Sequence, residues 1–183
     1  MKPILTYTCD EPEGKITRHV YPLIFTAENI QKLWERSHQF PTLFGREVGS
    51  IQEFYNLYID PESNQLLSGG LFWVIDDFVG IFYLTDISDM EATVHYSFFD
   101  QRHRGRGGLA RAMIKYVLSE YKFHRLNAFV PLYTSRYVRH FIASLGFILE
   151  GRKRQAAMFK GDWYDVMFYG MLYTDVYPPA EKA

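Results

Sequence analysis

A glycine–arginine segment, Arg102–Gly108, limits the folds open to this chain because it separates two stretches with different periodicity. Before it, Ala92–Phe99 alternates between two faces, as expected of a β-strand that packs one face on a core. After it, apolar residues recur at helical spacing from about Gly108 to Lys122. A strand that leads through a glycine-rich loop into such a helix indicates a mixed α/β fold.

The residue types in this loop suit the binding of an anion. The first turn of a helix leaves backbone N–H groups unpaired, and the helix dipole makes that end electropositive. Glycines let a ligand approach the backbone, and the three arginines of the loop add positive charge. The loop therefore predicts a phosphate or pyrophosphate site, although it matches neither the P-loop nor the dinucleotide-binding pattern. The alternatives are an ordinary turn with solubilising arginines and an RGG-like RNA-binding segment, and the helix that follows argues against the latter.

The distribution of charge supports an anion site near this loop. The chain of 183 residues has 20 basic and 21 acidic residues, and the net charge of −1 argues against a general binder of nucleic acids or membrane surfaces. Between Gln101 and Leu149, however, nine basic residues accompany the single acid Glu120, so this part carries +8 and the remainder −9. We interpret the segment as an anion-binding region, and the alternative is a solvated basic face.

Periodicity and turn residues predict the other elements. Ser50-Ile51-Gln52-Glu53 is a capping box at the start of a helix. The further expected elements are a strand at 16–21, a helix at 27–38, a hairpin at 70–75 and 78–85, a strand at 126–130, a helix at 135–145, and a closing hairpin at 147–160 and 163–173. We expect a flexible arm at 1–15, one folded domain at 16–175 and a tail at 176–183.

Composition also excludes several classes of protein. The single cysteine, Cys9, excludes an internal disulfide and a multi-cysteine zinc site, and it fits a reducing compartment. The most apolar stretch, Leu66–Leu84, carries Asp76 and Asp77 at its centre, which a membrane-spanning helix would not tolerate. The first residues show no secretory signal pattern. We therefore expect a cytoplasmic protein that does not enter a membrane.

Two motifs resemble those of a known family, the GCN5-related N-acetyltransferases (GNAT). Arg102-x-x-Gly105-x-Gly107 is similar to the family signature R/Q-x-x-G-x-G/A, which binds the pyrophosphate of acetyl-CoA. Gly146-Phe147-x-x-Glu150-Gly151 is similar to an element of the branch that contains the ribosomal-protein acetyltransferases, and the match covers about residues 70–172. The resemblance implies a single domain with a mostly antiparallel, twisted sheet of about seven strands, about four flanking helices, and splayed fourth and fifth strands.

The resemblance also implies a reaction and the residues that bind the cosubstrate. A primary amine, either a protein or peptide N-terminus or a small amine, would attack acetyl-CoA directly, without a metal. Backbone amides from about Arg104 to Leu109 would hold the pyrophosphate, and pantetheine would lie between the ends of two splayed strands. A strand-edge amide near Phe98 would polarise the thioester carbonyl, and Ser135 stands where the family usually has an asparagine that touches pantetheine. The implied cofactor-binding residues are Phe98, Phe99, Arg102, Arg104, Gly105, Arg106, Gly107, Gly108, Leu109 and Ser135.

Two departures from the family pattern concern proton transfer. Ile142 occupies the place where the family often has a tyrosine that protonates the departing thiolate. The family also often has a glutamate on the strand before the loop, whereas Val94–Phe99 contains no carboxylate. His95 is therefore the candidate catalytic base, because the pKa of a histidine suits proton transfer near neutral pH; a structural hydrogen-bonding role is the alternative, and Glu91 is the second candidate base.

These departures leave rival functions open. The first is a CoA-binding module whose transferase activity is lost or altered. The second is an RNA-binding domain, which the placement of most aromatic residues at core periodicity disfavours. For the lead hypothesis we expect acetyl-CoA and an amine as partners, with no nucleic acid and no membrane, in a monomer or homodimer.

Overall fold

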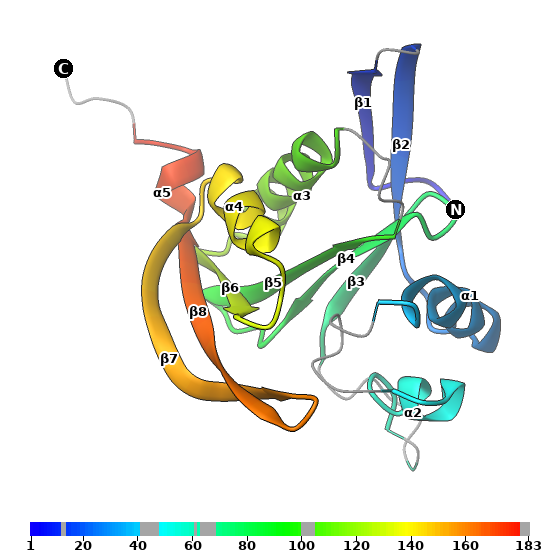
Figure 1. Ribbon diagram of the computed structural model, residues 1–183. Helices are drawn as coiled ribbons and strands as arrows, with labels where there is room; N and C mark the ends of the chain where they lie inside the picture. The colour runs from blue at the N-terminus through cyan, green and yellow to red at the C-terminus, as the bar shows by residue number, and fades with distance from the viewer. Residues whose placement is uncertain (12–13, 41–47, 61, 63–68, 100–104, 180–183) are drawn as a thin grey trace.

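An eight-stranded mixed sheet forms the centre of the computed structural model, in the order β1-β2-β3-β4-β5-β6-β8-β7 (Figure 1). The structure describes residues 1–11, 14–40, 48–60, 62, 69–99 and 105–179. Neighbouring strands are antiparallel except for β5 and β6, which are parallel. The predicted mixed fold with a mostly antiparallel sheet is therefore confirmed.

Apart from β1 and α5, the described strands and helices follow the predicted order. The strands are β1 (Leu5–Glu11), β2 (Gly14–Pro22), β3 (Leu71–Ile75), β4 (Gly80–Thr85), β5 (Glu91–Phe98), β6 (Arg125–Pro131), β7 (Ile148–Phe159) and β8 (Asp162–Leu172). The helices are α1 (Ala27–Ser37), α2 (Ile51–Tyr55), α3 (Arg106–Tyr121), α4 (Arg136–Ser144) and α5 (Tyr173–Val176). Among these helices, none is long and apolar enough to cross a membrane.

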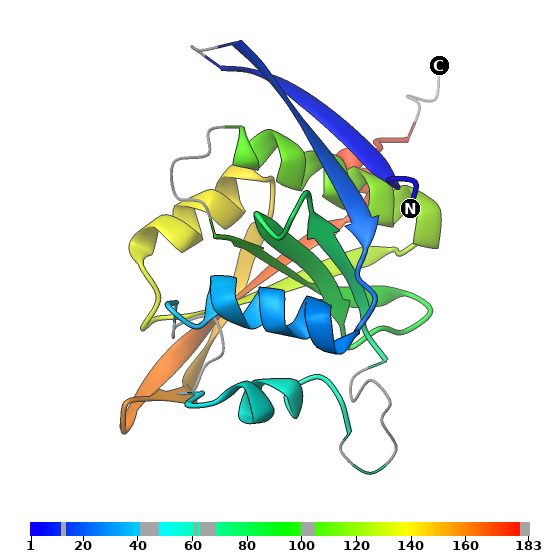
Figure 2. The ribbon, with the colours of Figure 1, turned by 90° about the vertical axis from the view of Figure 1, so that its right-hand side faces the viewer.

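Helices cover both faces of the sheet because the central strands alternate between two apolar cores. Side chains such as Phe82 and Leu84 pack with Met113 and Val117 of α3. On the opposite face, Ile81 and its neighbours pack with residues of α1 and α2, among them Ile30, Leu33 and Phe54. Figure 2 shows α1 and α3 on opposite sides of the strands. The two-residue alternation predicted from the sequence thus separates an α3 face from an α1–α2 face.

Strands β5 and β6 diverge along their length. They pair only where Glu91–Thr93 meets Arg125–Asn127. Beyond this point, β5 continues along β4 as far as Phe98, while β6 continues along β8 as far as Pro131. The two strands are therefore held by different partners, and a gap opens between them, as the resemblance predicted.

The expected flexible arm is the main error in the predicted fold. Residues 5–11 form β1, which pairs with β2 along its whole length and adds the eighth strand. Leu5 and Tyr7 pack against the α3 core, while on the other side of the strand Thr8 bonds Thr17, with 3.0 Å between the two hydroxyl oxygens. Figure 2 shows the hairpin running across α3. The alternation in this segment was a strand signal, but the nearby proline, glycine and charged residues obscured it.

Two helices have features that the sequence pattern alone does not show. Helix α2 is short and ends at Tyr55. Its capping box is present in modified form, because Ser50 accepts a hydrogen bond from the Glu53 N–H and the Glu53 carboxylate accepts one from Gly49 instead of Ser50. Helix α4 has no fully buried residue, and its Val138 is 39% exposed, because this helix forms one wall of an open cleft.

Candidate active site

The glycine–arginine loop leads into the N-terminus of α3, as predicted. Gly105 precedes the helix with φ of 76°, a left-handed conformation that favours glycine, and no side chain caps this end. The amides of Arg106, Gly107 and Gly108 lie in the first turn, where a helix offers no backbone acceptor. These three N–H groups and the helix dipole make an electropositive end that suits a phosphate.

Three of the predicted cofactor-binding residues are not exposed amides in the described part of the first turn. Arg102 and Arg104 lie outside the described residues. The N–H of Leu109 donates to the Gly105 carbonyl at 3.1 Å, and its side chain is fully buried. Leu109 thus takes part in the first helical hydrogen bond and in the core, whereas the amides of Arg106 to Gly108 precede that bond.

Gly107 and Gly108 have different surroundings. A Cβ atom on Gly108 would lie 1.8 Å from the Tyr7 hydroxyl oxygen, so the close packing of the β1–β2 hairpin requires glycine there. A Cβ atom on Gly107 would meet nothing closer than Phe141 at 3.8 Å. Gly107 thus leaves the side of the helix end that faces α4 open to a ligand. Sequence reasoning could not anticipate Tyr7, which is about 100 residues away in the chain.

A cleft of about 550 Å³ lies along the gap between β5 and β6. Its walls come from both faces of the sheet. On the α4 side it is lined by Ser135, Val138 and Ile142, and on the α1–α2 side by Tyr58, Tyr83 and His95. The remaining lining residues are Leu57, Val94, Tyr96, Ser97, Ala128, Phe129, Val130, Pro131, Tyr133 and Thr134. The cleft between the splayed strands is therefore lined by residues from both sides of the sheet.

Tyr96 connects this cleft to the start of α3. Its ring lines the cleft, and its hydroxyl donates to the Arg106 carbonyl at 3.2 Å. Burial raises the pKa of this phenol, while the positive charges of Arg106 and Arg18 oppose the shift. Tyr96 therefore stays a neutral hydrogen-bonding residue.

The end of β5 and the start of α4 hold the next predicted residues. The Phe99 N–H donates to the Val79 carbonyl at 2.9 Å, so alternate amides, including those of Phe98 and Tyr96, point away from β4 and toward β6. Ser135 lines the cleft and is also the N-cap of α4, where its hydroxyl accepts from the Tyr137 N–H at 3.3 Å. The structure thus places the Phe98 amide and the Ser135 hydroxyl on two sides of the gap.

His95 lies in the cleft wall on the α1–α2 side. Its ring stacks on Tyr83, with 4.4 Å between ring centroids and 5° between planes. Its Nε2 atom lies 2.8 Å from the Thr85 hydroxyl oxygen. Burial lowers the pKa of His95 from 6.5 to about 4, and the charge of Asp86 partly opposes this. The histidine is therefore neutral and able to accept a proton at neutral pH, but it is a weaker base than its residue type suggests.

The second candidate base, Glu91, is held in another network. Its carboxylate accepts from the Asn127 amide at 3.0 Å and lies 3.8 Å from the Arg125 guanidinium. Arg125 also pairs with Glu150, the glutamate of the Gly146–Gly151 element. Glu91 is not among the residues that line the cleft. These contacts give Glu91 and Glu150 a structural role in joining β5, β6 and β7.

Stability is expected to fall as the pH decreases from 6.5 to about 4, because His95 is protonated at a higher pH in the unfolded chain than in the folded one. In this interval the unfolded state binds more protons. The pKa shift of His95 corresponds to about 3 kcal/mol of folding free energy. This contribution is fully present above pH 6.5 and is lost once the pH falls below the pKa of His95 in the folded protein. Urea denaturation at a series of pH values measures this loss. His95→Gln should reduce the slope over this interval, and an unchanged slope would contradict the burial of a neutral histidine.

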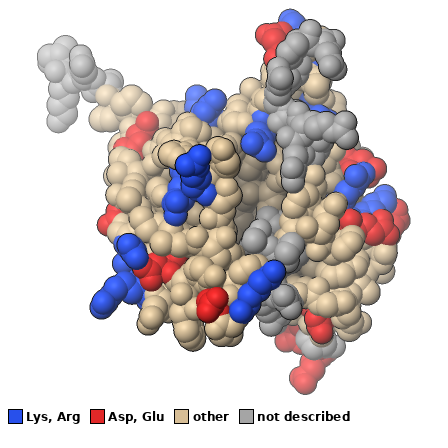
Figure 3. Space-filling model, viewed as in Figure 1, with Lys and Arg blue, Asp and Glu red and all other residues tan. Residues whose placement is uncertain are grey.

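Basic side chains surround the site without forming one patch. On the face in Figure 3, the visible Lys and Arg side chains lie at several separate places among acidic and uncharged residues. Arg111 donates to the Ser144 carbonyl at 3.1 Å and so links α3 to the end of α4. The described residues on this face therefore resemble the surroundings of a small anionic ligand more than a surface for a long polyanion.

Comparisons with known proteins agree with this geometry at the level of the fold. No protein-family model and no curated protein sequence matches the chain. Among solved structures, spermidine N-acetyltransferase from Vibrio cholerae in complex with CoA and spermine has a TM-score of 0.68 at 15% identity, with coverage of 85% of this chain and 96% of that one. Ribosomal-protein-S5-alanine acetyltransferase from Vibrio fischeri has a TM-score of 0.65 at 14% identity, with coverage of 91% and 96%.

A third structure, an acetyltransferase of the GNAT family from Bacillus anthracis, has a TM-score of 0.63 at 14% identity and covers 85% of this chain and 94% of its own. Because these sequence identities are low, the comparisons show a shared fold only. The similarity covers 85% to 91% of this chain in the three structures. The chain therefore has the fold of the GNAT acetyltransferases.

Proposed function

We propose that this protein transfers an acetyl group from acetyl-CoA to a primary amine. The observation that carries the proposal is the cleft between β5 and β6, which reaches residues on both faces of the sheet. On one face, Tyr96 connects it to the unpaired amides at the start of α3. On the other face, Tyr58, Tyr83 and His95 line it. This arrangement allows a thioester to enter from the α3–α4 side and an amine to reach it from the α1–α2 side.

The chain's own residues bind and orient acetyl-CoA. The amides of Arg106, Gly107 and Gly108 hold the pyrophosphate, and Arg102 and Arg104 are expected to add charge beside it. Pantetheine lies in the gap, next to the apolar side chains of Val138 and Ile142. A strand-edge amide of β5 near Phe98, on the side that faces away from β4, donates to the thioester carbonyl and stabilises the oxyanion formed there. No metal ion is needed for this chemistry.

The reaction is one acyl transfer without a covalent enzyme intermediate. The amine nitrogen forms a bond to the carbonyl carbon, the C–S bond breaks, and the amine loses a proton to His95. The departing CoA thiolate takes its proton from water, because Ile142 stands at the family's tyrosine position and carries no proton to donate. Most of the acceleration then comes from positioning and oxyanion stabilisation.

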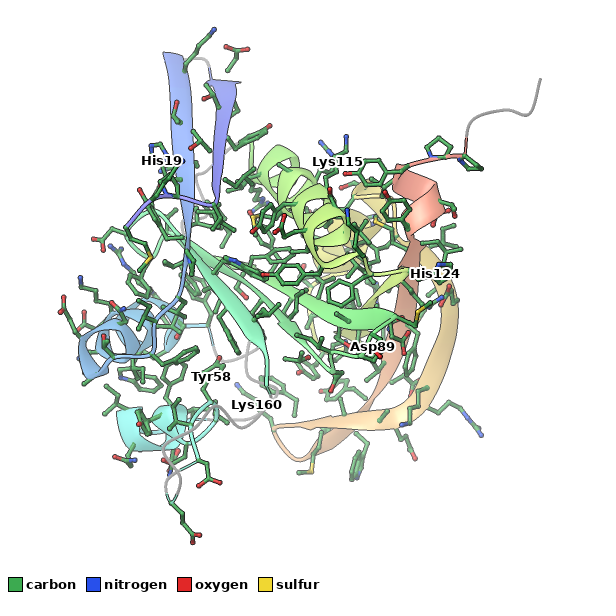
Figure 4. All side chains as sticks on the ribbon, turned by 180° about the vertical axis from the view of Figure 1, so that it is seen from behind. His19, Tyr58, Asp89, Lys115, His124 and Lys160 are labelled. Carbon is green, nitrogen blue, oxygen red and sulfur yellow. The ribbon has the colours of Figure 1, made fainter. Side chains whose placement is uncertain are left out.

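The amine side of the cleft is aromatic. Tyr58 follows α2 and lies between that helix and the sheet (Figure 4), and burial raises the pKa of its phenol and that of Tyr83, the latter to about 12. Both phenols are therefore uncharged. The similar structures named above come from enzymes with a polyamine or a ribosomal protein as acceptor. For this chain we propose a primary amine, acetylated in the reducing cytoplasm that its single cysteine suits.

A thiol-release assay tests the proposal. The purified protein is mixed with acetyl-CoA and a panel of polyamines, arylalkylamines, amino acids and peptides, and free CoA thiol is measured. We expect release that depends on at least one amine. CoA at about 100 times its dissociation constant should also stabilise the protein by about 2.7 kcal/mol. Stabilisation by CoA without amine-dependent release of thiol would favour the rival function, a CoA-binding module. The weak basicity of His95 and the isoleucine at the family's tyrosine position are the reasons for considering it. Absence of both would refute both functions.

Blocking the cleft should abolish thiol release without unfolding the protein. Val138 lines the cleft from α4 and is 39% exposed, so a Val138→Trp side chain can fill the cleft while little of the core is disturbed. We expect CoA binding to weaken by at least about 10-fold, since pantetheine would have to displace the indole. Tyr137→Trp is the matched control, because Tyr137 is 69% exposed and does not line the cleft. Equal effects of the two substitutions would argue against cofactor binding in this gap.

A further inference from the structure

Two residues behind His95 form a hydrogen-bonded chain with it. Thr85, the last residue of β4, has its hydroxyl oxygen 2.8 Å from His95 Nε2. The same hydroxyl donates to the Asp86 carboxylate, with 3.1 Å between Thr85 Oγ1 and Asp86 Oδ2. Neither Thr85 nor Asp86 lines the cleft, so both act from behind the imidazole.

The hydroxyl of Thr85 determines which nitrogen of His95 carries the proton. A threonine hydroxyl has one hydrogen to donate, and an ionised carboxylate only accepts. Because Thr85 donates to Asp86, it must accept from His95, and Nε2 is therefore the protonated nitrogen. Nδ1 then carries the lone pair. Stacking on Tyr83 fixes the plane of the ring.

Asp86 stands where the chain turns directly after β4, at the point where its carboxylate meets the Thr85 hydroxyl. Its φ of 50° is in the left-handed region, which aspartate and asparagine adopt more readily than most residues other than glycine.

We propose that Asp86 and Thr85 are positioning residues that hold His95 in the tautomer whose unprotonated Nδ1 takes the proton of the acceptor amine. The inference rests on the proposed function. As the C–N bond forms, the proton on the attacking nitrogen moves to Nδ1 and the ring becomes an imidazolium. The Nε2–H then donates to Thr85, and Thr85 donates to the Asp86 carboxylate, so the negative charge at the end of the chain stabilises the positive ring.

Charge around His95 supports this role for Asp86. Tyr83 of β4 stacks on the ring, and Tyr58 and Tyr133 line the same cleft, but all three are phenols with raised pKa values and carry no charge at neutral pH. Asp86 is the charged group that raises the pKa of His95 against the effect of burial. Removing its charge therefore weakens the base without touching the cleft wall.

The experiment compares kcat and KM of the full-length protein with the best acceptor from the amine panel. Thr85→Val removes the hydroxyl at nearly constant volume, and Asp86→Asn removes the charge with a residue that tolerates the left-handed backbone. We expect kcat to fall about 10-fold in each variant with little change in KM, because general-base catalysis contributes at least that much. Thr85→Ser, which keeps the hydroxyl, should have the kcat of the parent protein. Asp89→Asn, on the same connection between β4 and β5 (Figure 4), is the control with unchanged kcat.

Nitrogen NMR of ¹⁵N-histidine-labelled protein gives a readout that does not depend on turnover. We expect the His95 signal, assigned with His95→Gln, to show protonated Nε2 in the parent and Thr85→Ser and a mixture of tautomers in Thr85→Val. A parent with protonated Nδ1, or an unchanged kcat in both Thr85→Val and Asp86→Asn, would overturn the proposal. If the parent protein releases no thiol with any amine, the proposed function has failed and the role of Asp86 and Thr85 in catalysis fails with it. If the parent is active and both variants are as active as the parent, only the proposal for Asp86 and Thr85 is refuted.

Discussion

A Gly107→Asp variant is expected to fold at least as stably as the parent protein and to bind CoA about 100-fold more weakly. Gly107 lies in the first turn of α3, with an ordinary φ and no atom within 3.8 Å of the added Cβ. A carboxylate there interacts favourably with the helix dipole, which contributes about 0.3–1 kcal/mol. The carboxylate would also add negative charge beside the proposed pyrophosphate site and compete for the Arg111 guanidinium, whose nitrogens lie 3.9 and 4.0 Å from the added Cβ. Two like charges about 4 Å apart repel by several kcal/mol near a protein surface.

Titration calorimetry with CoA and thermal denaturation measure these two effects on the same sample. Gly107→Asn is the matched control, since it adds the same volume without the charge and should lose much less affinity. Equal affinities for the Asp and Asn variants would show that charge at this helix end does not matter. Undiminished affinity in both variants would place the phosphates elsewhere on the protein.

A Gly80→Ala variant is expected to lose about 2 kcal/mol of folding free energy, which is typical of an added atom that the packing cannot accept. A Cβ atom on Gly80 would lie 2.7 Å from the Ser97 carbonyl oxygen and 3.0 Å from the Phe98 ring. The glycine thus lets β5 approach β4 closely at the residues that border the cleft. An added methyl group would push Phe98 toward the gap, so CoA affinity should fall as well.

Chemical denaturation compares this variant with Gly151→Ala as the control. Gly151 also lies in a strand, β7, but a Cβ atom there would have nothing within 4 Å. We expect Gly151→Ala to be neutral or slightly stabilising, because alanine loses less backbone entropy than glycine. A Gly80→Ala variant as stable as Gly151→Ala would mean that β4 and β5 are not held as closely as the structure shows.

The sequence predicted the parts of the site that depend on local patterns. The strand–loop–helix around Arg102–Gly108 and the Gly146–Gly151 element indicated the fold, and the cleft lies where the splay of the strands was expected. Leu109 is the predicted residue whose side chain is fully buried, as its helical spacing suggested. The spacing of residues does not show which backbone N–H groups at the helix start are unpaired and which one donates the first hydrogen bond within the helix.

The features that the sequence could not predict depend on contacts between distant segments. Tyr7 meets Gly108 only because β1 pairs with β2 and packs on α3. The Asp86–Thr85–His95 chain depends on the register of β4 and β5, in which Thr85 pairs with Thr93, two residues before His95 on the same face. The lowered pKa of His95 likewise reflects burial, a property of the folded cleft, so residue type alone overestimated its basicity.

The central claim, that acetyl-CoA binds across the splayed strands with its pyrophosphate on α3, is tested most directly by amide NMR during a titration with acetyl-CoA. The account predicts the largest chemical-shift changes at Arg106, Gly107 and Gly108, with further changes along the facing ends of β5 and β6. The tip of the β7–β8 hairpin, around Lys160 and Gly161, should show none. Shifts confined to another face, or no shifts at millimolar acetyl-CoA, would contradict it.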